Sequence, residues 1–295
     1  MFIWIATFAY LLFALNGIAD KFLLTRAVKH PIAYAFYIGI TGPLTLVLAP
    51  FGLKLLHPAD FLVAIAGGSC FVLALYFLYT ATQETTISRL LPIEGGFVPG
   101  FTLILAYIIL GERLGNMKLV AFGFLVIGAI LIAFKKDANG WHPQALRNAL
   151  FAAFLFALSF TLTKYIYDQS NFVSGLIWTR LGFFLASLCF LIPRRNRNYI
   201  FNAPKETTAG NKFLYYGTRV TGGLGGLLQN YAISLGSVTI VNALQGTQYA
   251  FLLLLTILLS KYYPKILKER ISGPILAQKI SAMILISIGL ILLTL

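Results

Sequence analysis

Ten apolar segments separated by short polar connections constrain the fold of this chain more than any other feature of its sequence. Most of them approach the roughly 20 residues that an α-helix needs to cross the hydrocarbon core of a bilayer. Two connections, 193–211 and 260–275, are longer, polar and basic, but neither is long enough to form a soluble domain. The pattern therefore predicts an all-α integral membrane protein with ten transmembrane helices. The expected segments are 2–24, 31–53, 60–80, 87–109, 117–134, 145–167, 172–192, 212–234, 237–259 and 276–295.

The composition excludes a soluble globular protein. Hydrophobic residues make up 59% of the 295 residues and charged residues only 11%, whereas a soluble domain carries about 25% charged residues. The formal net charge of +14 fits basic residues gathered beside membrane spans. No basic stripe is interleaved with aromatic residues, so we expect no nucleic-acid partner. The three histidines lie on separate connections and the two cysteines inside apolar segments, which predicts no metal site and no cofactor.

The order of several landmarks indicates that the chain repeats itself. Lys21 and Lys164 end the first and sixth segments, 143 residues apart, and Tyr79 and Tyr231 end the third and eighth segments at a similar offset. Each half would contain five segments, and because five is odd the halves must have opposite orientations in the membrane. This is the inverted-repeat architecture of secondary transporters, which place their substrate near the bilayer midplane. Chance similarity between leucine-rich helices is the alternative.

A set of short motifs from the third to the fifth segment resembles a known transporter family. The motifs are Tyr79-x-Ala81, Leu91-Pro92, Gly111-Glu112-Arg113-Leu114, Gly123 and Gly128. In this order they resemble the EamA-type branch of the drug/metabolite transporter (DMT) superfamily. The resemblance implies two EamA-like repeats, at 1–140 and 141–295, and a metabolite exporter that moves amino acids or related compounds. It also implies that the chain is not an enzyme and lies in the bacterial cytoplasmic (inner) membrane.

Two arguments about the membrane orientation conflict. Most of the 23 Lys and Arg residues lie on odd-numbered connections or beside them, and the positive-inside rule then puts both termini outside the cytoplasm. The family resemblance implies that both termini lie inside. The sequence leaves the orientation open.

Glu94 is the first candidate site residue because it is a carboxylate inside the fourth apolar segment, flanked by proline and glycine. A charge at that depth is unfavourable unless it is paired or lines a wet cavity. We predict that Glu94 binds a cationic substrate group or a coupling proton. The alternative is a purely structural carboxylate paired with an interior arginine. Arg180 and Arg219 are the candidate partners, although Arg219 could instead reach the headgroups.

The remaining candidates are polar side chains inside other segments. Aligning the two halves by Tyr79 and Tyr231 places a polar stripe of the ninth segment opposite Glu94. Two arginines and one acid would make the interior positive, which favours a substrate with a carboxylate or a phosphate. We predict one substrate-binding cavity lined by eight residues. They are Asn16, Tyr79, Glu94, Arg180, Gln229, Asn242, Gln245 and Tyr249.

These observations predict a secondary carrier that moves a small organic metabolite by alternating access, with protons as the coupling ion and membrane lipid as its surroundings. No G-x-x-x-x-G-K-[ST] loop is present to bind a nucleotide. The alternatives are an exchanger of anionic metabolites, a polytopic membrane enzyme, and a passive channel or scaffold. The enzyme is disfavoured because the nine acidic residues are dispersed and form no metal-binding or catalytic pair.

Overall fold

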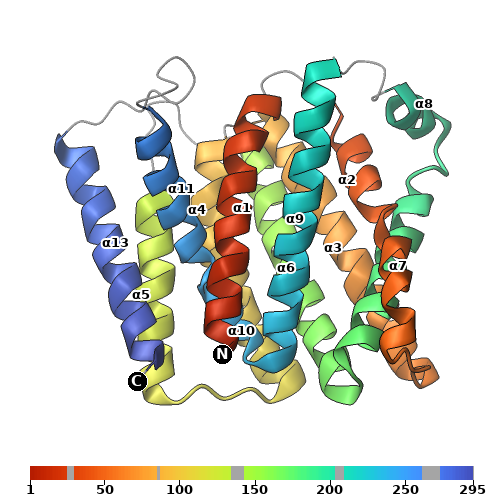
Figure 1. Cartoon of the computed structure of the whole chain (residues 1–295), viewed down its shortest axis with the longest axis horizontal. Coiled ribbons are helices and arrows are strands. Elements are labelled where there is room, and N and C mark those ends of the chain that lie inside the picture. The colour runs from red at the N-terminus through yellow and green to blue at the C-terminus, as the bar shows by residue number, and fades with distance from the viewer. Residues whose placement is uncertain (25–29, 85–86, 134–142, 203–208, 261–272, 295) are drawn as a thin grey trace. The chain divides into compact units, whose positions relative to one another are not determined.

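The computed structural model describes residues 1–24, 30–84, 87–133, 143–202, 209–260 and 273–294 (Figure 1). Over this part of the chain the secondary structure is helical and no strand occurs, which confirms the all-α prediction. Seven helical stretches of the described chain are long and apolar enough to cross a membrane, and three of them, Pro31–Phe51, Ile93–Leu110 and Val238–Thr256, each run over two of the helices named below. Two shorter helices, Phe2–Gly17 and Asn116–Ile132, are also apolar. These are the helices of a multi-pass membrane protein.

The helix boundaries follow the predicted segments closely. In chain order the helices are α1 (Phe2–Leu24), α2 (Pro31–Gly39), the 3-10 helix η1 (Gly42–Phe51), α3 (Pro58–Glu84), α4 (Ile87–Leu105), the π-helix η2 (Ala106–Leu110), α5 (Asn116–Ala133), α6 (Pro143–Gln169), α7 (Phe172–Cys189), α8 (Arg194–Asn202), α9 (Ala209–Leu235), α10 (Val238–Ala243), α11 (Gln245–Ser260) and α13 (Gly273–Thr294). Three predicted segments are interrupted, and α8 falls within a connection that the sequence predicted to be a loop.

The interruptions have local causes. In the second segment, α2 gives way to η1, which carries Pro43 in its first turn and Pro50 in its interior, and proline cannot donate the backbone hydrogen bond of a regular α-helix. In the fourth segment the last turn widens into η2 and stops at Gly111, which adopts a left-handed conformation at φ 65°. In the ninth segment Leu244 separates α10 from α11, and its carbonyl accepts a hydrogen bond from the Thr247 hydroxyl at 2.7 Å.

The helices form two compact units, and neither unit is a continuous half of the chain. The first unit comprises Met1–Ala27, Arg113–Lys136 and Thr208–Leu295, and therefore holds α1, α5, α9, α10, α11 and α13. The second unit comprises Val28–Glu112 and Asp137–Thr207, and holds α2, η1, α3, α4, η2, α6, α7 and α8. Each unit combines helices from both predicted repeats.

In the first unit α1 packs against α9 and α11, and α5 packs against α13 and α11. Gly246 of α11 fits against Ala129 and the Leu125 carbonyl of α5, so the α5–α11 contact depends on a residue without a side chain. Gly128 of α5 lies in the same way against Ile286 of α13.

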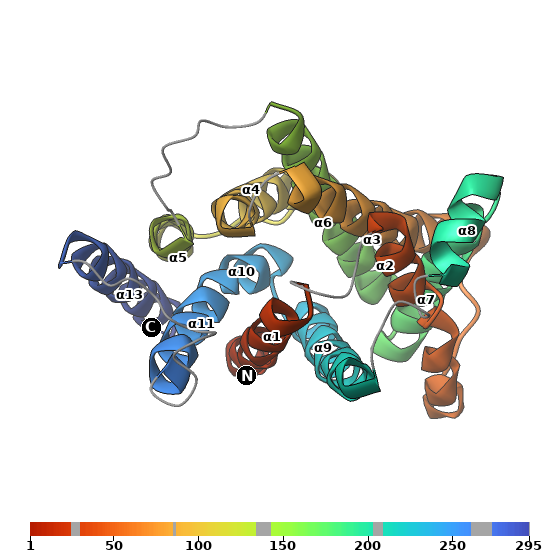
Figure 2. The same ribbon diagram turned by 90° about the horizontal axis from the view of Figure 1, so that it is seen from above.

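In the second unit α3 is the central helix, because it packs against α2, α6 and α7, and α6 also packs against α4 (Figure 2). Gly68 of α3 touches the α7 backbone at Thr179 and Gly182, and Gly182 in turn touches the Ile65 backbone. Phe71 of α3 adds a stacked contact with Phe183 of α7, with ring centroids 4.6 Å apart.

Candidate functional site

Glu94 lies in α4 of the second unit, on a helix fixed by an apolar cluster. Leu90 and Ile93 of α4 are buried in this cluster together with Ala81 of α3 and Ala149 of α6. Glu94 follows Ile93, about 10 Å along the axis from the first residue of α4, and is half-buried. Its carboxylate makes no hydrogen bond or ion pair with any described residue. A half-buried charge in an apolar helix therefore has no partner in the described part of the protein.

The backbone beside Glu94 offers a further hydrogen-bond acceptor. Pro99 lies inside α4 and has no backbone N–H, so the Gly95 carbonyl lacks the donor that a regular helix would supply from four residues later. The Glu94 carboxylate and the Gly95 carbonyl therefore lie on adjacent residues of one helix. Adjacent residues of a helix do not face the same side, so the Gly95 carbonyl is a separate acceptor and not a second ligand beside the carboxylate.

Arg180 lies near the middle of α7 in the same unit and is half-buried. Its guanidinium carbon sits 4.3 Å from the centre of the Phe183 ring, a cation–π contact. Within the described residues the guanidinium forms neither a hydrogen bond nor an ion pair. Glu94 and Arg180 are thus not paired with each other. A purely structural ion pair between these two residues, the alternative that the sequence left open, is not observed. The Arg219 side chain lies outside the described residues.

Tyr79 is the third predicted site residue in the second unit. It is half-buried on α3, and its ring meets that of Tyr34 of α2 edge to face, with centroids 4.3 Å apart. This contact holds α2 against α3. Tyr79 therefore has a packing role, and the substrate-binding role that the sequence predicted for it stays a prediction.

Gln229 belongs to a buried hydrogen-bond chain in the first unit. Its side-chain amide donates to the Tyr10 hydroxyl at 3.2 Å, and that hydroxyl donates to the Val241 carbonyl at 2.9 Å. These two hydrogen bonds connect α9, α1 and α10. Tyr10 was not among the predicted site residues, and its position on α1 opposite Gln229 is a result of the tertiary fold.

Asn16 also connects two helices of the first unit. Its side-chain oxygen accepts a hydrogen bond from the Thr221 hydroxyl of α9 at 3.3 Å. A side chain at Gly222 would begin 3.2 Å from the Asn16 amide nitrogen, so a larger residue there would push against Asn16. Asn16, which the sequence predicted as a substrate-binding residue, thus links α1 to α9 in the structure.

The polar stripe predicted on the ninth segment is divided by the break at Leu244. Asn242 lies on α10 and is 1% exposed, whereas Gln245 and Tyr249 lie on α11. The Gln245 amide donates to the Tyr249 hydroxyl at 3.2 Å. The stripe therefore does not run along one continuous helix as the sequence predicted.

The eight predicted residues are divided between the two units. Three of them lie in the second unit and five in the first. The five residues of the first unit all take part in polar contacts, whereas the two charged residues of the second unit have none in the described part of the chain. A single cavity lined by all eight remains a prediction.

Two polar residues that the sequence did not single out lack partners in the described structure. One carboxylate oxygen of Glu84 and the Thr239 hydroxyl are buried without a hydrogen bond. The predicted third segment stopped at residue 80, but α3 continues to Glu84, so the sequence placed this acid in a solvated connection. Among the described residues no group of His, Cys, Asp and Glu could hold a metal ion.

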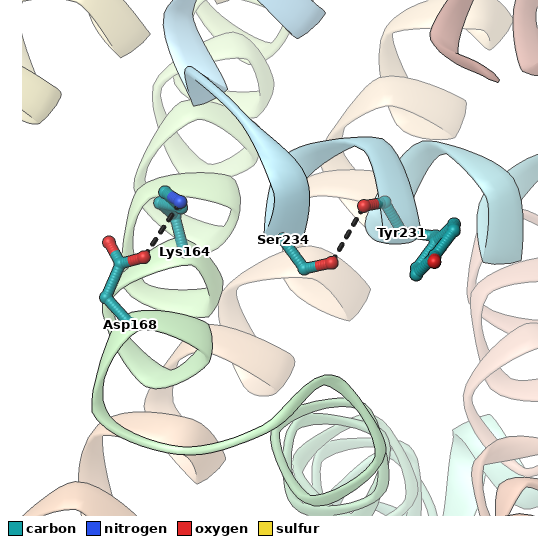
Figure 3. Close-up of polar contacts among 4 residues, drawn as sticks. All are labelled: Lys164, Asp168, Tyr231 and Ser234. Carbon is teal, nitrogen blue, oxygen red and sulfur yellow. Dashed lines mark hydrogen bonds and ion pairs between the residues drawn. The ribbon is translucent and has the colours of Figure 1, made fainter. Parts of the chain in front are cut away.

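The symmetry landmarks take part in local contacts (Figure 3). Lys164 forms an ion pair with Asp168, one turn further along α6, at 2.8 Å. The Ser234 hydroxyl donates to the Tyr231 carbonyl at 2.7 Å within α9. The sequence used Lys164 as a landmark of the repeat, and in the structure its ammonium group is paired with the Asp168 carboxylate. The Lys21 side chain lies outside the described residues.

Comparison with known proteins gives a fold but no family. No family model matches the chain, and no curated protein matches it. Among 27 matching chains of solved structures, one described only as "Crystal structure of protein" has a TM-score of 0.69 at 18% sequence identity. The match covers 100% of this chain and 98% of that chain. At this identity the similarity concerns the fold alone.

Proposed function

We propose that the protein is a secondary transporter of a small organic metabolite, an amino acid or a related compound, and that it exports this compound by alternating access. The observation that carries the proposal is the Glu94 carboxylate, which is half-buried in an apolar helix of a multi-pass membrane protein and lacks a described partner. Ionisable residues in such positions mark substrate or proton pathways. The EamA-type resemblance of the sequence agrees with this function.

The helix contacts support the proposed architecture of ten spans in two inverted repeats. If the first five segments correspond to the last five, α1 corresponds to α6, α3 to α9, and α4 to α10 and α11. In the first unit α1 packs against α9 and α11, and in the second unit α6 packs against α3 and α4. These two pairings therefore occur in both units with the repeats exchanged.

Individual contacts follow the same correspondence. The offset of 143 residues between the first and sixth segments relates Phe13 to Phe156. The Phe13 ring lies against Gly225 of α9, and the Phe156 ring lies edge to face against Phe71 of α3 at 5.2 Å. Both phenylalanines thus face the helix that the repeat assigns to them.

The proposed substrate class rests on the EamA-type resemblance, and the charges of Glu94 and Arg180 agree with it. Glu94 would bind an ammonium group or a proton, and Arg180 would bind a carboxylate, because a guanidinium offers paired donors that match carboxylate oxygens. An amino acid carries both groups. If Glu94 is instead protonated during transport, Arg180 alone would select an anionic metabolite, which is the second candidate function.

The test uses purified protein in proteoliposomes, with a pool of the standard proteinogenic amino acids as the probe and mass spectrometry as the readout. We expect Glu94→Gln to lower uptake driven by a pH gradient by about tenfold or more, since the substitution removes the charge that holds the proton or the ammonium. Exchange of internal for external amino acids should persist in part. Asp168→Asn removes an acid that lies in an ion pair at the end of α6, and it should leave both rates close to those of the unsubstituted protein.

Two results would contradict the proposal. Unchanged pH-driven uptake in Glu94→Gln would remove Glu94 from the coupling mechanism. Flux without saturation and without counterflow would indicate a channel, and chemical conversion of the probe would indicate an enzyme.

A further inference from the structure

Helix α8 (Arg194–Asn202) is a short basic helix that follows α7 in the second unit. The sequence predicted only a polar, basic connection here. Figures 1 and 2 show that the axis of α8 runs across the axes of α2 and α7 and not along them. An amphipathic helix in this orientation lies parallel to the membrane surface if α2 and α7 cross the membrane.

One face of α8 is fixed to the ends of the neighbouring helices. Ile200 is fully buried against Ala33 and Phe36 of α2, and its carbonyl accepts a hydrogen bond from the Tyr37 hydroxyl at 2.9 Å. The Tyr199 ring stacks on His30, with centroids 4.1 Å apart. The position of α8 relative to α2 is therefore set by apolar, aromatic and hydrogen-bond contacts together.

The rest of α8 presents three arginines. Arg194, Arg195 and Arg197 are exposed, and the helix contains no acidic residue. Arg195 donates from Nε to the Tyr199 hydroxyl at 2.9 Å, and Arg197 donates from Nε to the Leu191 carbonyl at 2.6 Å. Each guanidinium has five N–H donors, so these contacts fix the direction of the two side chains and leave most of their donors available.

Large apolar side chains are exposed beside the arginines. Phe201 on α8 is 59% exposed, and Ile192, just before the helix, is 72% exposed. Basic residues next to exposed apolar residues are typical of helices that rest at the boundary between headgroups and acyl chains. A purely aqueous anion would make use of the arginines but not of Phe201 and Ile192.

We propose that α8 lies flat on the membrane surface and that its three arginines bind the phosphate groups of anionic phospholipids. The guanidinium fork matches phosphate oxygens in two-point contacts, and basic residues at the surface are attracted to anionic lipids. Because Arg195 and Arg197 are already held in place, little conformational freedom is lost when a lipid binds. This proposal does not depend on the transport function.

Native mass spectrometry of the detergent-purified full-length protein tests it, with phosphatidylglycerol and phosphatidylcholine of equal chain length as the probes. We expect the unsubstituted protein to retain phosphatidylglycerol in preference to phosphatidylcholine. The triple variant Arg194→Gln/Arg195→Gln/Arg197→Gln should lose about tenfold or more in affinity for phosphatidylglycerol and change little toward phosphatidylcholine. A matched variant, Lys54→Gln/Arg113→Gln/Lys118→Gln, removes three exposed charges elsewhere and should change either affinity by less than about twofold.

The triple variant also removes the contacts to Tyr199 and Leu191, so a milder change accompanies it. Arg194 forms no hydrogen bond or ion pair with another described residue, and Arg194→Gln alone should lower the phosphatidylglycerol affinity severalfold without lowering the melting temperature. Equal losses in the triple variant and in the matched variant would overturn the proposal, because they would indicate general charge attraction. Displacement of the lipid by inorganic phosphate at millimolar concentration would also overturn it, since the site would then be a phosphate site.

Discussion

Two helix crossings, one in each unit, are packed in different ways. At the α1–α9 crossing of the first unit, Gly225 faces the Phe13 ring, so a side chain fills the space that the glycine leaves. At the α3–α7 crossing of the second unit, Gly68 and Gly182 face backbone atoms of the opposite helix. The helices of the second crossing approach each other closely enough for their backbones to touch.

The predicted site residues of the two units also differ in their contacts. In the first unit Gln229 and Asn16 form hydrogen bonds between helices, so they contribute to holding the bundle together. In the second unit Glu94 and Arg180 form none with the described residues. The comparison indicates that the α3–α7 crossing depends on close backbone packing, and that Glu94 and Arg180, unlike Gln229 and Asn16, do not link described helices by hydrogen bonds.

The largest expected effect is on the second unit's glycine crossing. A methyl group at Gly68 would collide with the Thr179 carbonyl and with the Gly182 and Phe183 backbone, and backbone atoms cannot move aside as a side chain can. We expect Gly68→Ala to destabilise the protein by about 3 kcal/mol or more, measured as a lower midpoint of thermal unfolding in detergent. Gly100→Ala is the matched control, because nothing lies within 4 Å of a side chain at that position. A small effect of Gly68→Ala would mean that the crossing is looser than the structure shows.

A smaller effect is expected from the hydrogen-bond chain of the first unit. Gln229→Leu removes the donor to the Tyr10 hydroxyl but keeps the side chain's approximate volume. We expect a loss of about 1 kcal/mol, the size typical of hydrogen bonds between membrane helices, in the same unfolding measurement. Transport per folded molecule should be unchanged. A loss of transport with unchanged stability would instead place Gln229 in the substrate path. The difference between the site residues of the two units would then not hold.

The smallest effect on stability is expected at Glu94. Because the carboxylate has no described partner, Glu94→Gln removes a half-buried charge and breaks no observed contact. We expect the unfolding midpoint to stay the same or to rise slightly, a change of at most about 1 kcal/mol, although uptake driven by a pH gradient falls. A strong destabilisation would show that Glu94 is a structural residue, as Gln229 and Asn16 are in the first unit.

Several sequence predictions depended on local pattern and failed where tertiary contacts decide. The connection 193–211 was predicted as a loop because its residues are basic, but burial of Ile200 and the contact with Tyr37 accompany a helix there. Asn242 and Gln245 were predicted on one helix, and the break at Leu244 separates them.

The sequence by itself determined that the protein is all-α, where its apolar segments begin and end to within a few residues, and that Glu94 and Arg180 lie inside apolar helices. These properties follow from hydropathy and segment length, since a helix in lipid must satisfy its backbone within its own residues. Only the tertiary structure decided which helices pair, that each compact unit mixes both predicted repeats, and which polar residues have partners. Such properties depend on contacts between residues far apart in the chain. The sequence of an apolar helix is much the same whether the helix packs against lipid or against another helix.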